Sequence, residues 1–317
     1  MKKHILIFPE YITEKLKDIQ VILDNISQLS TVYNDRITLD FSKSRFIASE
    51  LSPLIDSIIY YFESHNNEVI VHTQSLKFKV KQALSRNRFL EKHNLELTHS
   101  PDDYQTAISY TNFSLNKSSE DWSKYISEYL KREVFENIYW PKENSKIAMS
   151  KIKESIVEIV DNIFTHSHSE KVFLCGQYYP QKHKLNFTIL DTGDGIPDVV
   201  SMVAENRDKS DSEKIDWAMR EGTTTINEMS SKTTRGIGLS TIYEELLGYG
   251  ELTILSSKGY WKLTSGTSII EPTKILKNLN FGMPGTLIHI SFFTEKMSSI
   301  DVTHNKRVID NIFEDIF

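Results

Sequence analysis

The chain has 317 residues, of which 39% are hydrophobic and 25% are charged, as is ordinary for a soluble globular protein with room for two domains. A formal net charge of −6 gives no electrostatic case for general nucleic-acid binding. No apolar run reaches the ~18 residues that would cross a bilayer. The single cysteine, Cys175, cannot form an internal disulfide, which is typical of a cytoplasmic protein, and its apolar surroundings predict a buried side chain.

Residues 1–115 alternate between strand and helix patterns, which is typical of a small α/β domain. The predicted strands are residues 5–8, 36–41 and 68–73, and the predicted helices are residues 13–29, 48–63 and 78–90. Residues 93–120 are polar and have no clear period, and we place a domain boundary near residue 115.

One stretch of this first domain, from Ile37 to Leu51, predicts a strand, a short loop and a serine that opens a helix. This pattern resembles the STAS domain of anti-sigma-factor antagonists, and the resemblance implies a phosphorylatable serine near Ser49. The chain has Ala-Ser-Glu-Leu at 48–51 where that family usually has Asp-Ser-Ser-Gly, so the acidic residue and the glycine are missing. The alternative interpretation, which we favour, is that Ser49 only caps a helix.

Residues 116–295 form the second predicted domain, which begins with a helix over 122–135 and continues with another that ends near residue 166. At about 100° per residue, one arc of the second helix is apolar. This arc contains Ile152, Ile156, Ile159, Val160, Ile163 and Phe164. Glu158 and Asn162 lie on the opposite arc, one turn apart. A carboxylate that could activate water therefore lies beside an amide oxygen that could hold a metal ion.

Two strands, 171–179 and 184–191, follow this helix, and the short polar turn between them predicts an antiparallel pair. Asp191 ends the second strand, and Gly193 and Gly195 permit a tight turn or a close approach to a flat ligand. A further glycine loop at 233–240 opens a helical pattern, and the free N–H groups of such a loop suit a phosphate.

Three motifs in these segments resemble those of the GHKL ATPases, the superfamily of gyrase, heat-shock chaperone, histidine kinase and mismatch-repair proteins with the Bergerat nucleotide-binding fold. The motifs are Glu-x-x-x-Asn at 158–162, Asp-x-Gly-x-Gly-Ile at 191–196 and Arg-Gly-x-Gly-Leu at 235–239, in the order that the family has them. A fourth element, Gly-Thr at 285–286 at the start of a strand, matches its last motif.

This resemblance covers roughly residues 120–295 and implies an α/β sandwich with a mixed, largely antiparallel sheet. Strands at 251–256 and 285–293 would complete the sheet, and residues 198–235 would form a lid over ATP, with a helical turn at 217–220. We leave residues 258–283 unassigned.

The residue types suggest how ATP and Mg²⁺ would be held. The adenine amine would donate to Asp191, Thr286 would reach the base through a water, and Asn162 would bind Mg²⁺. In the resembling family a glutamate at the position of Glu158 activates the attacking water. The other expected nucleotide contacts are Gly193, Gly195, Ile196, Arg235, Gly236, Ile237, Gly238 and Leu239.

We therefore expect a cytoplasmic, Mg²⁺-dependent ATP-binding protein, a slow ATPase whose lid closure changes its interaction with a protein partner or a second copy. Two alternatives stay open: a protein-serine kinase of the partner-switching type, and a non-catalytic ATP-sensing scaffold. Residues 296–317 are predicted to form a helical tail.

Overall fold

The computed structural model describes five continuous segments of the chain and three single residues between them. These are residues 1–114, 119–138, 145–220, 249–264 and 272–298, with Leu239, Ile242 and Leu246. In this part the protein has the mixed α/β class that the sequence predicts, with helices packed on parallel and antiparallel sheets. None of the described helices has the length and apolar character needed to cross a membrane.

The elements follow one another in a mixed order. The strands are β1 (Lys3–Ile7), β2 (Tyr11–Ile12), β3 (Arg36–Asp40), β4 (Phe46–Ile47), β5 (Glu68–Val71), β6 (Ala107–Ser114), β7 (Lys171–Tyr179), β8 (Lys184–Asp191), β9 (Gly250–Thr264) and β10 (Thr273–Phe293). The α-helices are α1 (Leu16–Ser27), α2 (Ser52–Ser64), α3 (Phe78–Arg86), α4 (Phe89–Lys92), α5 (Ser119–Leu130), α6 (Ser145–His166), α7 (Ile196–Val200), α8 (Asp211–Ala218) and α10 (Thr294–Ser298). Shorter turns are the 3₁₀ segments η1 (Ser49–Leu51), η2 (Thr73–Ser75), η4 (Pro180–Lys182) and η5 (Ala204–Asn206), and the π-helical segment η3 (Lys131–Phe135).

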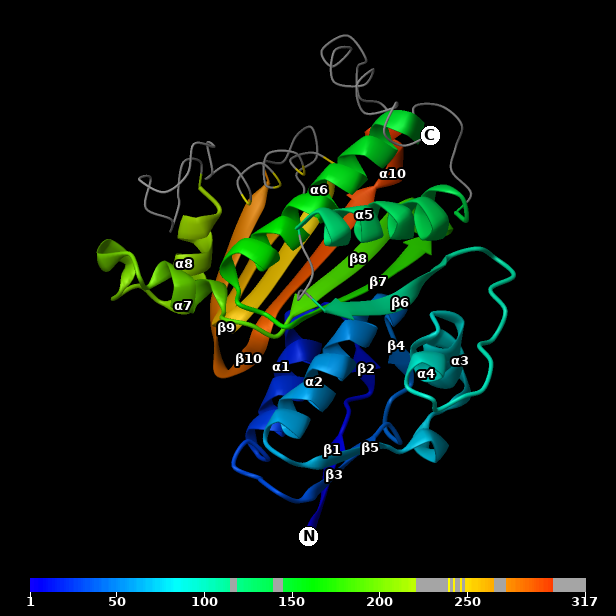
Figure 1. Ribbon diagram of the computed structural model, residues 1–317, viewed down its shortest axis with the longest axis vertical. Coiled ribbons are helices and arrows are strands. Elements are labelled where there is room, and N and C mark those ends of the chain that lie inside the picture. Colours follow the sequence, from blue (N-terminus) through cyan, green and yellow to red (C-terminus); the bar gives the residue numbers. More distant parts are fainter. Residues whose placement is uncertain are drawn as a thin grey trace.

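These elements stack in four layers (Figure 1). Helices α5 and α6 cover one face of a five-stranded sheet, and α1 and α2 lie against its other face. The same two helices also contact β1 and β5 of the N-terminal sheet, so they lie between the two sheets. The N-terminal half therefore packs on one face of the large sheet and buries it.

The N-terminal sheet is parallel, in the order β1-β3-β5, with Lys3 opposite Arg36 and Arg36 opposite Glu68. The strands and helices predicted for this region are present. The helix predicted over 78–90 is divided into α3 and α4 at Arg88, whose φ of 65° is left-handed. Helical periodicity of the apolar residues does not reveal such a break, because Phe89 and Leu90 stay buried beyond it.

The large sheet is antiparallel throughout, in the order β6-β7-β8-β10-β9. The antiparallel pair predicted for β7 and β8 is confirmed. Within the polar stretch 93–120, whose sequence has no clear period, residues 107–114 form the edge strand β6. Because β6 pairs with β7, we propose that any division of the chain into two domains falls before Ala107 rather than near residue 115.

The last two strands are longer than predicted. The strands expected at 251–256 and 285–293 belong to β9 and β10, and most of the unassigned segment 258–283 forms their continuation. The pairing is irregular between Asn278 and Thr286, where two register shifts interrupt the alternation that would have revealed the strand.

Both faces of the large sheet are buried, and alternate side chains of each strand enter different cores. In β7, Val172 and Leu174 join the core under α5 and α6, whereas Phe173 and Cys175 join the core of the N-terminal half. Cys175 is thus the buried apolar side chain that the sequence predicts, and burial raises the pKa of its thiol. The strand reads as a continuous apolar run because neither face meets water.

Buried polar groups fix the N-terminal half on the sheet. Ser49 is 5% exposed, and its hydroxyl donates to Oε1 of Gln177 at 2.7 Å. The prediction that Ser49 caps a helix was wrong, since no side-chain cap is made at η1. Beside it, Glu50 is fully buried and accepts from the Tyr179 hydroxyl at 2.9 Å and from Nδ2 of Asn186 at 2.7 Å. Burial raises the pKa of the Glu50 carboxyl.

Asn87 joins three elements at this contact. It is fully buried, and its Nδ2 donates to the carbonyl of Ser49 at 2.9 Å and to the hydroxyl of Ser52 at 2.6 Å. Its backbone carbonyl accepts from the N–H of Tyr110 in β6 at 2.7 Å. The corner between α3 and α4 is therefore tied to both α2 and the edge of the large sheet.

We expect the substitution Asn87→Ala to lower the free energy of unfolding by about 2–3 kcal/mol, because it leaves the buried Ser49 carbonyl and the Phe89 N–H with fewer partners. Urea denaturation of the full chain measures this. Ser64→Ala, which removes an exposed hydroxyl bonded to the Tyr61 carbonyl, is the control and should cost far less. Equal stability of the two variants would contradict the interpretation.

Candidate active site

Helix α6 carries the first group of candidate residues. Its predicted apolar arc is buried from Ile152 to Ile163, against the large sheet and α5. The prediction was wrong for Phe164, which is 37% exposed and lies with its ring centroid 6.1 Å from that of Trp122. Glu158 and Asn162 are half-buried on the other side of the helix.

Glu158 and Asn162 contact each other as their spacing predicts. Nδ2 of Asn162 donates to Oε1 of Glu158 at 3.2 Å and to its backbone carbonyl at 2.8 Å. Partial burial, with a smaller contribution from Asp161, raises the pKa of the Glu158 carboxyl, and the bond from Asn162 opposes the rise. A raised pKa makes this carboxylate a better proton acceptor near neutral pH. The amide of Asn162 uses its NH₂ group on Glu158, which leaves Oδ1 to bind a cation.

The second group lies at the end of β8, on the face that α6 covers. Leu185, Phe187 and Ile189 enter the core under α6, and the strand period of two places Asp191 on that face. Asp191 pairs with Thr286 of β10, and Thr286 pairs with Ser256 of β9. Directly opposed residues of antiparallel strands share a face. Asp191, Thr286 and Ser256 therefore form a row across the sheet below α6.

Asp191 is 1% exposed, and its Oδ1 accepts from the N–H of Gly193 at 2.8 Å. Burial raises the pKa of Asp191 to about 7, against the opposing effect of hydrogen bonds from the Gly193 N–H and the Ser167 side chain. Near neutral pH this carboxyl is divided between its two protonation states, so a ligand that donates a hydrogen bond to it favours the ionised form.

The row is completed by hydroxyl groups. The Oγ atoms of Ser256 and Thr286 lie 2.8 Å apart, and both residues are buried. Ser256 also accepts from the N–H of Ile196 at 2.8 Å, which fixes the start of α7. Sequence reasoning found Thr286 through its motif but missed Ser256, the last residue of a predicted strand. The pairing register that places it here is not visible in the sequence.

The turn after Asp191 is tied to the end of α6. The N–H of Asp194 donates to the carbonyl of Ser167 at 2.6 Å. A Cβ on Gly193 would lie 2.0 Å from the same carbonyl oxygen, so only glycine permits this approach. Ser167, which sequence reasoning also missed, thus sets the distance between α6 and the end of β8.

The described part of the segment expected to form a lid, residues 198–220, contains the end of α7, then η5 and α8. The helical turn predicted at 217–220 is the end of the longer helix α8 (Asp211–Ala218), which starts with a capping box between Ser210 and Glu213. Asp216 of α8 accepts from Nε1 of Trp261 and from Nζ of Lys274, each at 3.0 Å. This part of the segment is therefore attached to the β9–β10 hairpin.

The predicted phosphate loop, residues 233–240, is described only at Leu239. Arg235, Gly236, Ile237 and Gly238 lie outside the described residues. Leu239 is described, and its partly buried side chain packs against the core under α6. The structure thus places Asp191 in one row with Thr286, and Asn162 in contact with Glu158.

The donors near α6 suit a hard cation. The described residues contain no group of three or more His, Cys, Asp or Glu side chains that could hold a metal ion. Asn162 and Glu158 offer oxygen atoms only, as Mg²⁺ prefers, and Mg²⁺ commonly takes one or two protein ligands with the rest from phosphates and water. The residues present therefore fit a magnesium ion that arrives with a nucleotide.

Comparisons with known proteins add little to this geometry. No protein-family model matches the chain, and no curated protein matches it. Among solved structures, the chain is similar to the topoisomerase IV ATP-binding domain of Francisella tularensis in complex with a small-molecule inhibitor. That match has 17% sequence identity and a TM-score of 0.27, and it covers 65% of this chain and 85% of the other. A likeness this low is no evidence of function, and only the geometry of the site bears on it.

We expect Gly285→Ala to destabilise the protein by at least about 2 kcal/mol. Gly285 has a φ of +81°, and a Cβ there would lie 1.9 Å from the carbonyl oxygen of Asp191. The positive φ disfavours any side chain at this position. The carbonyl oxygen belongs to the backbone of β8 and cannot move away without separating β8 from β10. The control is Gly282→Ala, whose Cβ would lie 3.2 Å from the Ser257 carbonyl carbon. Chemical denaturation compares them, and equal losses would contradict the role given to Gly285.

Proposed function

We propose that this chain binds ATP with Mg²⁺ between α6 and the end of β8, in the manner of the GHKL ATPases, and hydrolyses it slowly. The observation that supports this best is the position of Asp191. Its buried carboxyl lies at the end of β8, on the α6 face, in one row with Thr286 and Ser256. Strands β8, β9 and β10 thus bring one carboxylate and two hydroxyl groups into a single row, which supports this proposal.

Adenine recognition would depend on Asp191. The exocyclic amine of adenine is a donor, and an ionised carboxylate in a site that excludes water is its strongest acceptor. The paired hydroxyl groups of Thr286 and Ser256 can hold a water that bonds to a ring nitrogen. The missing side chain of Gly193 lets the turn approach Ser167, and the base would lie against the backbone of this turn. Gly195 and Ile196 continue this wall.

The phosphates and the metal ion would lie toward α6. Oδ1 of Asn162 would bind Mg²⁺, which would neutralise charge on the phosphates. Glu158, one turn earlier, would take a proton from the attacking water, and its raised pKa suits that role. Arg235, Gly236, Ile237, Gly238 and Leu239 complete the proposal as contacts of the terminal phosphates.

The proposal includes a change of shape on binding. Residues 198–235 would close over ATP and alter the surface offered to a protein partner or a second copy. Because α8 is attached to β9 and β10, closure either moves the hairpin with α8 or leaves α8 in place. The kinase alternative loses its proposed acceptor within this chain, since the hydroxyl of Ser49 is buried and bonded to Gln177.

We expect Asp191→Ala to weaken binding of Mg·ADP on the order of 100-fold, because the adenine amine loses its acceptor. Titration calorimetry on the full chain measures this, and an unfolding curve for the variant shows that it still folds. Unchanged affinity would remove the basis of the proposed site.

The pH dependence of binding supplies an independent check. Since the free carboxyl has a pKa of about 7 and the ligand favours its ionised form, affinity should rise with pH and level off above about pH 8. Below pH 7 the fall should approach about tenfold per unit. Asp191→Asn cannot ionise, so the difference between the two proteins isolates this group from ionisation of the nucleotide. Identical pH profiles would contradict the assignment.

We expect Glu158→Gln to leave ATP affinity nearly unchanged and to slow phosphate release by about 100-fold or more, because the amide cannot accept a proton. The control is Glu154→Gln, one turn earlier on α6, where the carboxylate accepts from the Ser150 hydroxyl at 2.6 Å. A wild-type chain that binds ATP without turnover would favour the scaffold alternative. Transfer of the γ-phosphate to a protein serine instead of water would favour the kinase.

A further inference from the structure

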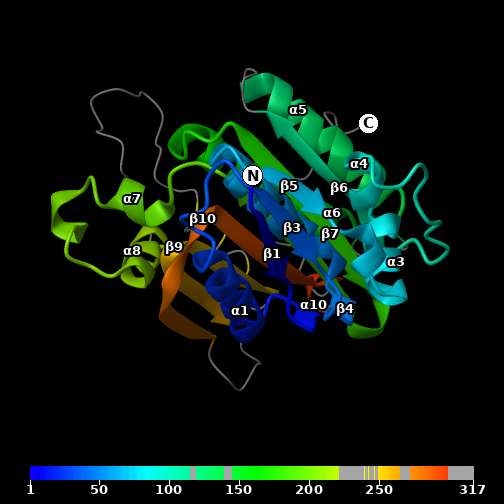
Figure 2. The same ribbon diagram turned by 90° about the horizontal axis from the view of Figure 1, so that it is seen from below.

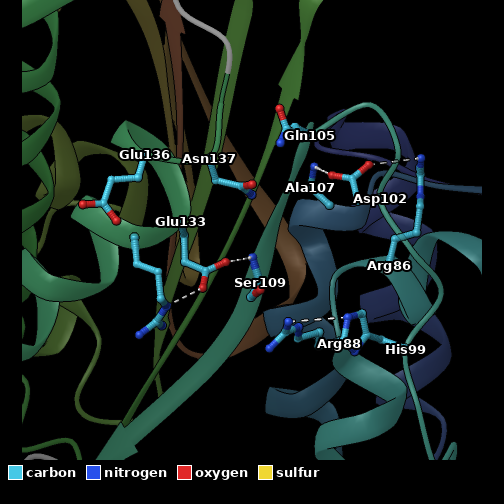
Figure 3. Close-up of a pocket in the computed structure, with 11 residues that line it drawn as sticks. Arg86, Arg88, His99, Asp102, Gln105, Ala107, Ser109, Glu133, Glu136 and Asn137 are labelled. Carbon is cyan, nitrogen blue, oxygen red and sulfur yellow. Dashed lines mark hydrogen bonds and ion pairs between the residues drawn. The ribbon is translucent and has the colours of Figure 1, made fainter.

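A cavity lies at the seam between the two halves of the chain, and none of the residues proposed for ATP lines it. It has a volume of about 490 Å³, and we call it the seam cavity. In Figure 3, Arg86, Arg88 and Asp102 line one side, whereas Glu133 and Asn137 lie across from them. Figure 2 shows α3 and α4 on the opposite side of the molecule from α7 and α8. The volume falls within the ~300–1,000 Å³ of sites for small molecules.

The seam cavity is lined by an unusual number of cationic side chains. Arg86, Arg88 and Arg132 lie in its wall together with His99. Three guanidinium groups around one cavity repel one another, and such a group is stable only where anions compensate it.

The wall also contains the carboxylates of Asp102, Glu133 and Glu136, but their partners are mostly groups other than Arg86 and Arg88, and Oε1 of Glu136 lies 3.9 Å from Nζ of Lys131. Oδ2 of Asp102 accepts from the backbone N–H groups of Thr106 and Ala107, each at 2.6 Å. Glu133 accepts from the N–H of Ser109 at 3.2 Å and from Nε of Arg132 at 2.8 Å. Arg132 is therefore paired, and the carboxylate of Asp102 is already engaged by the backbone.

Arg86 and Arg88 make no hydrogen bond to a carboxylate among the described residues. Nε of Arg86 is buried without a hydrogen-bond partner there, and its Nη1 lies 3.9 Å from Oδ1 of Asp102, beyond hydrogen-bond distance. Nη2 of Arg88 lies 3.4 Å from Nε2 of His99, whose other ring nitrogen lies 3.0 Å from Glu91. Leaving the donor groups of a guanidinium without acceptors costs free energy, so an added acceptor would stabilise this wall.

The backbone of the wall is strained at the same positions. Arg88 has a φ of 65° and Gln105 a φ of 51°, a region that favours glycine or asparagine. The facing wall contains the π-helical segment η3, and π-turns are frequent at functional sites. Non-glycine residues in sparsely populated backbone conformations cluster at ligand sites.

We propose that the seam cavity binds a small molecule bearing a phosphate group, held by the guanidinium groups of Arg86 and Arg88. The planar fork of arginine matches phosphate oxygens through two parallel hydrogen bonds. Phosphate supplies acceptors for the guanidinium NH₂ groups of Arg86 and Arg88, to which no carboxylate is hydrogen-bonded among the described residues. None of the residues proposed for ATP takes part, so this site stands or falls separately.

The test is a calorimetric titration of the full chain with pyrophosphate in the absence of Mg²⁺. The wild type should bind it saturably, and Arg88→Asn should weaken binding by about tenfold or more. Asparagine tolerates a positive φ, so this variant should be at least as stable as the wild type. Arg45→Asn, which removes an exposed arginine paired with Glu10 outside the cavity, is the charge-matched control and should bind normally.

Several outcomes would overturn the proposal. Saturable binding that Arg88→Asn leaves unchanged would place pyrophosphate elsewhere, for example at the proposed ATP site. Absence of binding at millimolar pyrophosphate, or tighter binding of citrate with the same dependence on Arg88, would show that phosphate is not the ligand class. If Arg88→Asn does not fold, Arg88→Lys is used instead, because lysine keeps the positive charge but lacks the planar guanidinium. Wild-type affinity for pyrophosphate in Arg88→Lys would also contradict the proposal.

Discussion

The large sheet is buried on both faces, and most of the structure depends on that constraint. A strand between two cores is expected to supply apolar side chains on both faces, as β7 does from Val172 to Cys175, whereas β8 carries buried polar side chains at Asn186, Thr188 and Asp191. Where such a strand carries a polar side chain, the group is enclosed and must find a partner or change its ionisation. Asp191 at the end of β8 is the clearest case, since its turn supplies one N–H donor and burial raises its pKa.

The face on which a polar group lies decides what it can do. Asn186 of β8 faces the N-terminal half and donates to Glu50 of η1, which holds the two halves together. Asp191, five residues later, faces α6 and has its side chain in a row with Thr286 and Ser256. A shift of one residue in the pairing would exchange these two faces. The close approach of Gly285 to the Asp191 carbonyl, which no other residue permits, favours the observed pairing.

Sequence patterns predicted this fold best where one physical signal dominates. The bounds of β7 and β8 were predicted in full because two strand-like runs are separated by a short polar turn, and α6 was predicted from its apolar arc, except at Phe164. The edge strand β6 was missed because it follows a long polar segment.

At the candidate site, glycine-containing motifs led to Asp191 and Thr286, whereas Ser256 and Ser167 depend on pairing and docking distances that no local pattern contains. The seam cavity was missed for the same reason: its arginines come from segments that meet only in the folded chain.

The polar contacts between the halves do more than hold them together. Buried hydrogen bonds add little net stability compared with apolar packing of equal volume, but they disfavour other arrangements of the two halves, because these would leave Glu50 and Asn87 without partners.

The strands that make these contacts also reach both candidate sites. Gln177 and Tyr179 of β7 bond to Ser49 and Glu50, and Val172 of the same strand pairs with Asp191. Strand β6 contributes the Tyr110 N–H to Asn87 and the Ser109 N–H to the wall of the seam cavity. Because β6 and β7 are paired, a ligand that changed the spacing of the two halves at the seam would act on the strand next to Asp191 through covalent and hydrogen-bonded connections alone.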